Sequence, residues 1–136
     1  MIPIKSERDL RVMRKSCEIA ATVLDKISKL AVAGVSTWDL NEAAKRLMDQ
    51  YHCRSASYKY KCGSLKYPCH VCISVNDQVI HGIASKDVIL KDSDIVSIDC
   101  ATIYQGFVGD NTRTVYIGEP SPDVRKLVEA TAESLR

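Results

Sequence analysis

The chain has 136 residues, which favours a single domain, and its 46% hydrophobic and 26% charged residues are ordinary for a globular protein. The formal net charge of +2, with both signs mixed along the chain, gives no electrostatic case for binding nucleic acid or a membrane surface. No apolar stretch approaches the roughly 20 residues of a membrane span, and residues 1–15 lack the apolar stretch of a secretory signal. We therefore expect a cytoplasmic domain.

Two amphipathic helices are predicted at the start of the chain. Residues 6–9 resemble a capping box, and apolar residues then recur at spacings of three and four as far as Leu30. This helix should end near Gly34, and Ser36 or Thr37 should begin a second helix. One face of the second helix is apolar, with Leu40, Ala44, Leu47, Met48 and Tyr51.

The middle of the chain has weaker signals. Residues 53–68 show no regular pattern and are predicted to be a loop. A short strand is expected over 71–75, followed by a turn at Asn76-Asp77 and an apolar return segment at 79–81.

A long β-hairpin is predicted over residues 94–118, where two β-branched runs flank Tyr-Gln-Gly-Phe. Residues 105–106 make a two-residue loop in which the glycine supplies a positive φ. This register places Asp99 opposite Thr112. Asp110 then lies on the same face as Asp99, as a diagonal neighbour roughly 7–8 Å away between backbones.

Two carboxylates on one partly buried face repel each other unless something lies between them. A divalent cation satisfies both, and a pair of metals about 3.5–4 Å apart can be bridged by such groups. A shared proton is a second solution. In a third arrangement one aspartate faces solvent or belongs to a turn. Spacing alone leaves these three open.

A third helix is predicted at the end of the chain. Ser121 can cap it, and Pro122 at its first position costs no hydrogen bond. No stop signal follows before Arg136. The elements together indicate an α+β fold, with helices on one face of a mostly antiparallel sheet.

Six cysteines without a secretory signal are read as reduced thiols. Cys62, Cys69 and Cys72 could form a structural zinc site, with a fourth ligand from His52, Cys53 or His70. The signal is weak, because there is one C-x-x-C pair and no second one. The alternative is a cysteine-rich loop, residues 53–72, whose thiols surround a substrate site.

Three stretches together resemble the N-terminal half of a type I methionine aminopeptidase. They are GVSTWDLNEAA at 34–44, SVNDQVIHGI at 74–83 and DIVSIDCATIYQGFVGDNTRTVYIG at 94–118. The resemblance runs from about residue 3 to the end. It implies an α/β fold that is half of a pita bread, with an antiparallel sheet covered by helices. It also implies a centre of up to two divalent metals (Co, Mn, Fe or Zn) that hydrolyses the bond after an N-terminal methionine.

The resemblance assigns roles to individual residues. Asp99 matches the bidentate metal ligand, and Asp110 matches the aspartate that bridges both metals. His81 matches the catalytic histidine that contacts the substrate near the scissile amide, although alone it could be a structural histidine after a strand. Cys72 matches a pocket position for the methionine side chain. Backbone groups near Asn76 and Gln78 match a monovalent-cation site of the family.

The family draws its remaining metal ligands, a histidine and two glutamates, and a further histidine from a second half that this sequence does not match. Residues 1–136 therefore correspond to the N-terminal portion as a single domain, with the C-terminal half absent, and activity alone should be weak or incomplete. The chain is then a fragment that needs a complementing half, a half that self-associates, or an inactive module that binds nascent chains. A prolidase-like peptidase fragment is the rival within the same fold.

Overall fold

The computed structural model describes residues 2 and 4–135, except for the side chain of Cys62. Its long hairpin pairs β5 (Ile95–Tyr104) with β6 (Phe107–Tyr116) along their full length. Two shorter strands, β4 (Cys72–Val75) and β1 (Arg54–Ser55), pair with the first and last parts of β5. All these pairings are antiparallel, as predicted. A separate two-stranded hairpin joins β2 (Lys61–Cys62) to β3 (Leu65–Lys66).

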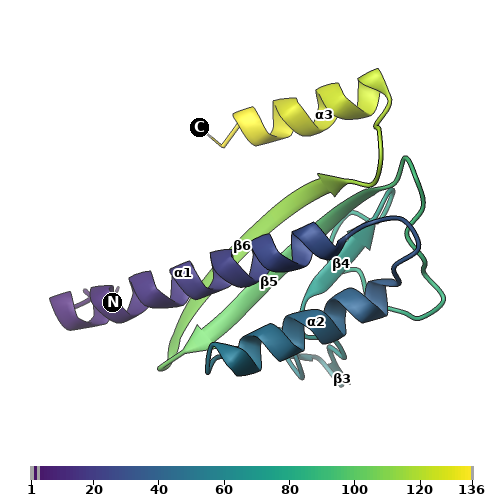
Figure 1. Ribbon diagram of the computed structural model, residues 1–136. Helices are drawn as coiled ribbons and strands as arrows, with labels where there is room; N and C mark the ends of the chain where they lie inside the picture. Colours follow the sequence, from purple (N-terminus) through teal and green to yellow (C-terminus); the bar gives the residue numbers. More distant parts are fainter. Residues whose placement is uncertain (1, 3, 136) are drawn as a thin grey trace.

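Two helices cover one face of this sheet, α1 (Glu7–Leu30) and α2 (Thr37–Gln50) (Figure 1). Each begins with a capping box, which was predicted for α1, whereas only a cap at Ser36 or Thr37 was predicted for α2. In α1 the Asp9 N–H donates to the Ser6 hydroxyl (3.2 Å) and the Ser6 N–H donates to the Asp9 carboxylate (3.0 Å). Ser36 and Asp39 make the same two hydrogen bonds at the start of α2. Of the two caps expected from the sequence, Ser36 and Thr37, the structure therefore has Ser36.

The core lies between the helices and the sheet because β5 alternates. Val96, Ile98 and Cys100 are buried toward the helices, and the odd-numbered residues of the strand lie on the opposite, partly open face. Apolar residues of α1 such as Ile27 complete the core. Burying a Val or Ile side chain contributes roughly 1.5–3 kcal/mol, so this layer stabilises the backbone on which the open face is built.

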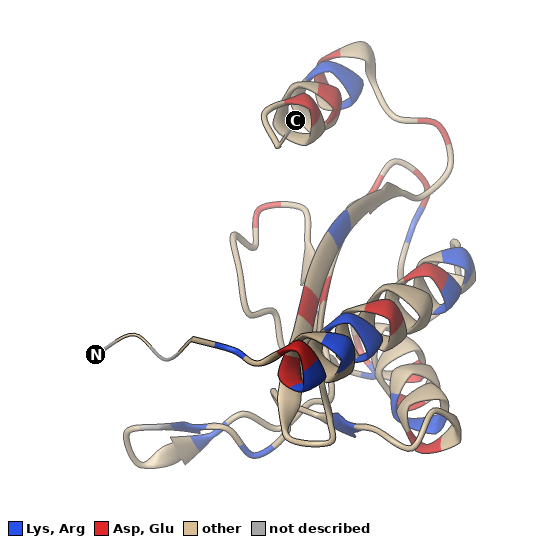
Figure 2. Ribbon diagram, turned by 90° about the vertical axis from the view of Figure 1, so that its left-hand side faces the viewer, with Lys and Arg blue, Asp and Glu red and all other residues tan. Residues whose placement is uncertain are grey.

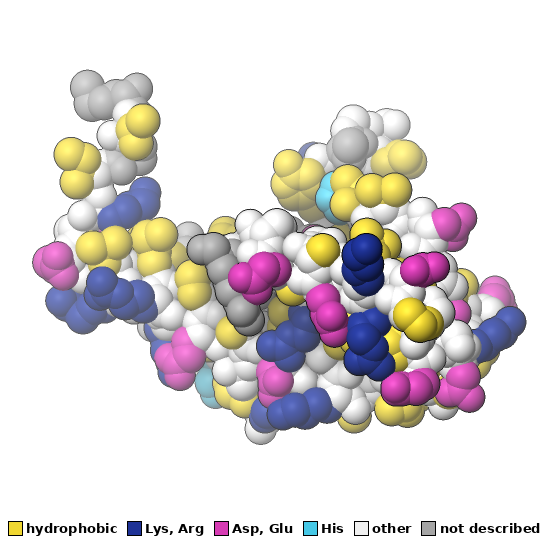
Figure 3. All heavy atoms as spheres, turned by 90° about the horizontal axis from the view of Figure 1, so that it is seen from above, with side chains coloured by type: hydrophobic (Ala, Val, Ile, Leu, Met, Phe, Trp, Pro, Cys, Tyr) yellow, Lys and Arg dark blue, Asp and Glu magenta, His cyan; other side chains and the backbone are white. Residues whose placement is uncertain are grey.

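The third helix, α3 (Pro122–Glu133), corrects the expectation that all helices cover the sheet. Ser121 caps it as predicted, but no residue of the helix is buried. It stands apart from the sheet in Figure 1, and its outward surface carries both basic and acidic side chains in Figure 3. Local capping specifies that this segment is a helix, but it does not specify where the helix packs.

Two predictions for the middle of the chain are wrong. Residues 53–68 are not a loop throughout, because β1 pairs with the distant strand β5 and because β2 and β3 pair with each other as a local hairpin. Residues 79–81 form no strand, since His81 has a positive φ of 57° that interrupts extended backbone. Within the described residues, no helix is long and apolar enough to cross a membrane.

Candidate metal and substrate site

The predicted register of the two aspartates is confirmed. Asp99 pairs with Thr112 and Asp110 pairs with Ala101, so the two carboxylates are diagonal neighbours across β5 and β6. Both lie on the sheet face opposite α1 and α2. Asp99 is half-buried and Asp110 is exposed, so the pair stands at the boundary between the sheet and solvent.

This placement changes the protonation of Asp99. Burial raises the pKa of its carboxyl group, and the negative charge of Asp110 raises it further. A hydrogen bond with Thr112 and the charge of His81 oppose this shift, while a hydrogen bond between the two carboxyl groups reinforces it. Without a cation, the carboxyl group of Asp99 therefore binds a proton more readily than a free aspartate does. A divalent cation between the two groups would favour both charged forms instead.

A cavity of about 370 Å³ lies over this face of the sheet. It brings together four residues that the sequence singled out, Asp99, Asp110, His81 and Cys72. Its other walls come from Ala101 and Val108 of the hairpin and from a segment predicted to be a loop, with Ala56, Ser57, Tyr60 and Tyr67. Neither tyrosine was predicted from the sequence to belong to the site, although the aromatic spacing in YKYKCGSLKY was the available signal.

His81 owes its place to the glycine that follows it. A Cβ on Gly82 would overlap the carbonyl oxygen of Ile73, so only glycine fits against β4. The Gly82 N–H donates to the Ser74 hydroxyl (3.1 Å), and its carbonyl oxygen accepts from the Tyr67 hydroxyl (2.7 Å). The carbonyl also accepts from the Ile73 N–H (3.0 Å). Three polar groups thus hold the backbone next to His81, whose side chain remains exposed beside the carboxylates.

A second close approach lies behind Asp110. A side chain on Gly109 would overlap the backbone of Ser16 and Cys17 in α1. The buried Ser16 hydroxyl donates to the carbonyl oxygen of Phe107 (2.8 Å), which joins the helix to the same strand. Helix α1 therefore supports β6 directly beneath one of the two carboxylates.

Cys72 lies opposite Asp99 in the pairing of β4 and β5. Burial raises the pKa of its thiol, so it stays protonated and contributes a small, weakly polar wall. Burial likewise raises the pKa of the Tyr67 hydroxyl, and the neighbouring thiols raise this pKa further by smaller amounts. This end of the cavity is suited to an uncharged side chain.

The predicted monovalent-cation residues serve to close a turn. The Asn76 side chain donates to Asp94 (2.9 Å) and accepts from the Ile95 N–H (3.0 Å). The Gln78 side chain accepts from the Val75 N–H (3.0 Å). Neither residue lines the cavity. A cation bound by backbone groups near them stays a prediction.

The zinc prediction also stays untested, because the side chain of Cys62 lies outside the described residues. Cys69 is buried and its thiol lies 3.9 Å from the Ala84 carbonyl oxygen, while Cys72 faces the cavity. Within the part of the chain that the structure describes, no three His, Cys, Asp or Glu side chains gather closely enough to hold a metal. The same finding applies to the two aspartates with His81.

Known proteins resemble this chain over nearly its whole length. A methionine aminopeptidase from Aquifex aeolicus is 40% identical over an alignment of 136 positions, which covers 98% of this chain and 53% of that protein. Methionine aminopeptidase B of Synechocystis is also 40% identical, over 96% of this chain and 48% of its own length. The chain thus spans about half the length of the curated relatives that it matches.

Solved structures agree with these sequence matches. The methionine aminopeptidase of Rickettsia prowazekii superposes with a TM-score of 0.92 at 33% identity, over 98% of this chain and 52% of that one. The prolidase of Pyrococcus furiosus, at 23% identity and a TM-score of 0.78, shares the fold alone. The fold is thus half of a pita bread, as expected. Residues 11–136 match metallopeptidase family M24, and the chain belongs to that family.

Proposed function

We propose that this chain forms one half of a methionine aminopeptidase site, which removes the N-terminal methionine from peptides or nascent chains by metal-dependent hydrolysis. One observation carries the proposal. The diagonal pair Asp99 and Asp110 forms one wall of the 370 Å³ cavity that also contains His81. A pair of carboxylates in a concave site is suited to a divalent cation rather than to a buried ion pair.

The donor set fits part of a metal centre. Asp99 and Asp110 would hold one side of it, because carboxylate oxygens are hard ligands and burial alone disfavours the charge of Asp99. When bound, the divalent metals supply an activated water and polarise the substrate carbonyl. Two carboxylates do not distinguish Co, Mn, Fe and Zn, so the metal is to be identified by analysis of the purified protein.

The other residues of the cavity have roles that do not depend on the metal. His81 would donate a hydrogen bond to the substrate near the scissile amide, from a backbone held by Gly82. Cys72 and Tyr67 would contact the methionine side chain, whose thioether packs well against sulfur and aromatic groups. Within this arrangement His81 is the catalytic residue, and Cys72 binds substrate.

The site needs further ligands, and β6 suggests how a partner could supply them. This ten-residue strand pairs only with β5 among the described residues, so its outer edge has free backbone groups. A complementing C-terminal half or a second copy of the chain could cover it. We place this assembly in the cytoplasm, where the cysteines stay reduced, and cell fractionation tests that location.

A second function is favoured by the incomplete ligand set. With no cluster of three metal-ligating side chains in the described part of the chain, the cavity could bind the ends of nascent chains without cleaving them. Asp99→Asn would then leave peptide binding intact. A prolidase-like activity has only the shared fold in its favour.

The test measures methionine release from a Met-Ala-Ser peptide with added Mn or Co. The purified chain is assayed beside its Asp110→Asn variant, which exposes contaminating activity. Release that the variant lacks, in the chain alone or after addition of a separately expressed second half, would support the proposal. Equal release by both proteins, or none even with the second half, would refute it in favour of the binding function.

A further inference from the structure

The β2–β3 hairpin is the most one-sidedly charged part of the molecule. From residue 50 to residue 76 the sequence has no Asp or Glu, but it has four basic residues, Arg54, Lys59, Lys61 and Lys66. Figure 2 shows the hairpin projecting from the side of the sheet opposite α1 and α2, with basic positions on both strands. It therefore extends from the open face on which the cavity lies.

Two of these lysines are placed in an unfavourable arrangement. Lys61 and Lys66 are paired directly across β2 and β3, and like charges in that position destabilise a hairpin. Neither lies within ion-pair distance of a carboxylate in the described structure. A bound anion would relieve this repulsion, so the pair is better suited to a complex than to the free chain.

The hairpin is also continuous with the cavity. Tyr60 and Tyr67, which precede Lys61 and follow Lys66, line the cavity beside Asp99. Strand alternation turns the lysine pair to the other face of the hairpin, where flexible side chains carry their charge along its rim. An extended peptide advances about 3.3–3.6 Å per residue, so its third to fifth residues would reach this rim.

We propose that the β2–β3 hairpin selects peptide substrates that carry Asp or Glu at about the third to fifth positions. This inference rests on the proposed function, because it assumes that the cavity receives the peptide N-terminus. A polypeptide is favoured over nucleic acid, since Tyr60 and Tyr67, the neighbours of the two lysines, line the cavity and the net charge is only +2.

The test compares binding of three fluorescent peptides that differ only after the third residue, Met-Ala-Ser followed by three Glu, three Gln or three Lys. Anisotropy is measured in EDTA, so that the acidic peptide does not compete for metal. We expect the Glu peptide to bind roughly two- to tenfold more tightly than the Gln peptide, as two exposed charge pairs allow. High salt should abolish the difference.

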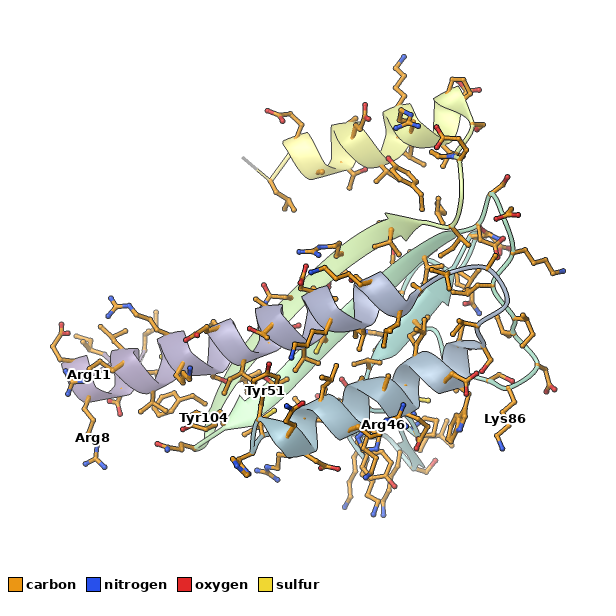
Figure 4. The ribbon with its side chains drawn as sticks, viewed as in Figure 1. Arg8, Arg11, Arg46, Tyr51, Lys86 and Tyr104 are labelled. Atoms are coloured by element: carbon orange, nitrogen blue, oxygen red, sulfur yellow. The ribbon has the colours of Figure 1, made fainter. Side chains whose placement is uncertain are left out.

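Matched variants locate the effect. Lys61→Glu converts the like-charged pair into an opposite-charged pair with Lys66, so the hairpin keeps its fold while the preference for the Glu peptide disappears. Lys86→Glu is the control, because Lys86 is exposed and lies away from the hairpin, beyond the start of α2 (Figure 4). It should leave the preference unchanged.

Several outcomes would overturn the inference. They are equal affinity for the three peptides, no binding at millimolar concentration, a preference that survives Lys61→Glu, or tighter hairpin-dependent binding of an oligouridine. Acetylated peptides separate this inference from the proposed function. If acetylation of the methionine has no effect, the cavity does not recognise a free N-terminus, but a lysine-dependent preference would still stand.

Discussion

Gly109 packs against the backbone of Ser16 so closely that no side chain fits between β6 and α1. The residue after Gly109 is Asp110, so a contact between a helix and a strand on the core side supports a carboxylate on the open side. The position of this carboxylate therefore depends on residues that have no contact with the cavity.

Gly109→Ala should destabilise the fold by about 1–3 kcal/mol, because the new methyl group forces α1 away from β6. Urea unfolding followed by circular dichroism measures the change. Ser16→Ala removes only the hydrogen bond to Phe107 and should cost about 1 kcal/mol. A neutral Gly109→Ala would show that the helix moves freely on the strand.

Tyr67→Phe should cost about 0.5–1.5 kcal/mol, since it removes the hydroxyl that donates to the Gly82 carbonyl oxygen. The ring still fills its place in the cavity, so the effect should concentrate on the neighbouring His81. Its ring signals in NMR spectra should shift or broaden. Tyr60→Phe is the matched control, because the Tyr60 hydroxyl has no hydrogen-bond partner in the described structure. Equal spectra for the two variants would contradict the conclusion that the Tyr67 hydroxyl holds the backbone at Gly82.

Asp99→Asn should stabilise the metal-free chain near neutral pH and abolish stabilisation by Mn or Co. The pKa of Asp99 is raised in the folded state, chiefly by burial. Asp99 therefore contributes fully to the free energy of unfolding below the pKa that it has in the unfolded chain. This contribution is lost as the pH rises through the pKa that Asp99 has in the folded chain. Unfolding in EDTA at acidic and neutral pH measures this loss, which the variant should lack. A parent protein whose stability does not fall over that range would contradict the carboxylate arrangement.

The cysteines should differ strongly in reactivity toward a thiol reagent such as DTNB. Cys17 is exposed on α1, whereas Cys100 is fully buried, and burial raises the pKa of the Cys100 thiol to about 12. At about pH 8, the exposed Cys17 should react in the folded protein and Cys100 only after unfolding. A Cys62→Ser background limits the titration to the described cysteines, and Cys17→Ser identifies the fast phase. Rapid reaction of Cys100 in the native state would mean that the core opens easily.

Local chemistry made much of this fold readable from the sequence. The capping residues of α1, α2 and α3 were recognisable because a cap joins a side chain to a backbone N–H only three residues further along. The register of Asp99 and Asp110 followed from a two-residue turn at Gln105-Gly106 and from strand alternation. The family resemblance then gave these aspartates, His81 and Cys72 their expected roles.

Tertiary structure decided what depends on contacts between distant segments. Within residues 53–68, β1 became a strand by pairing with β5, and the hydroxyl of Tyr67 bonds the distant Gly82 at the cavity, whereas β2 and β3 form a local hairpin. The supports at Gly82 and Gly109 are likewise invisible in a linear pattern, since each glycine is required by the backbone of another element. Turns and caps are formed within a few residues, whereas the walls of a cavity are brought together by burial of the whole core.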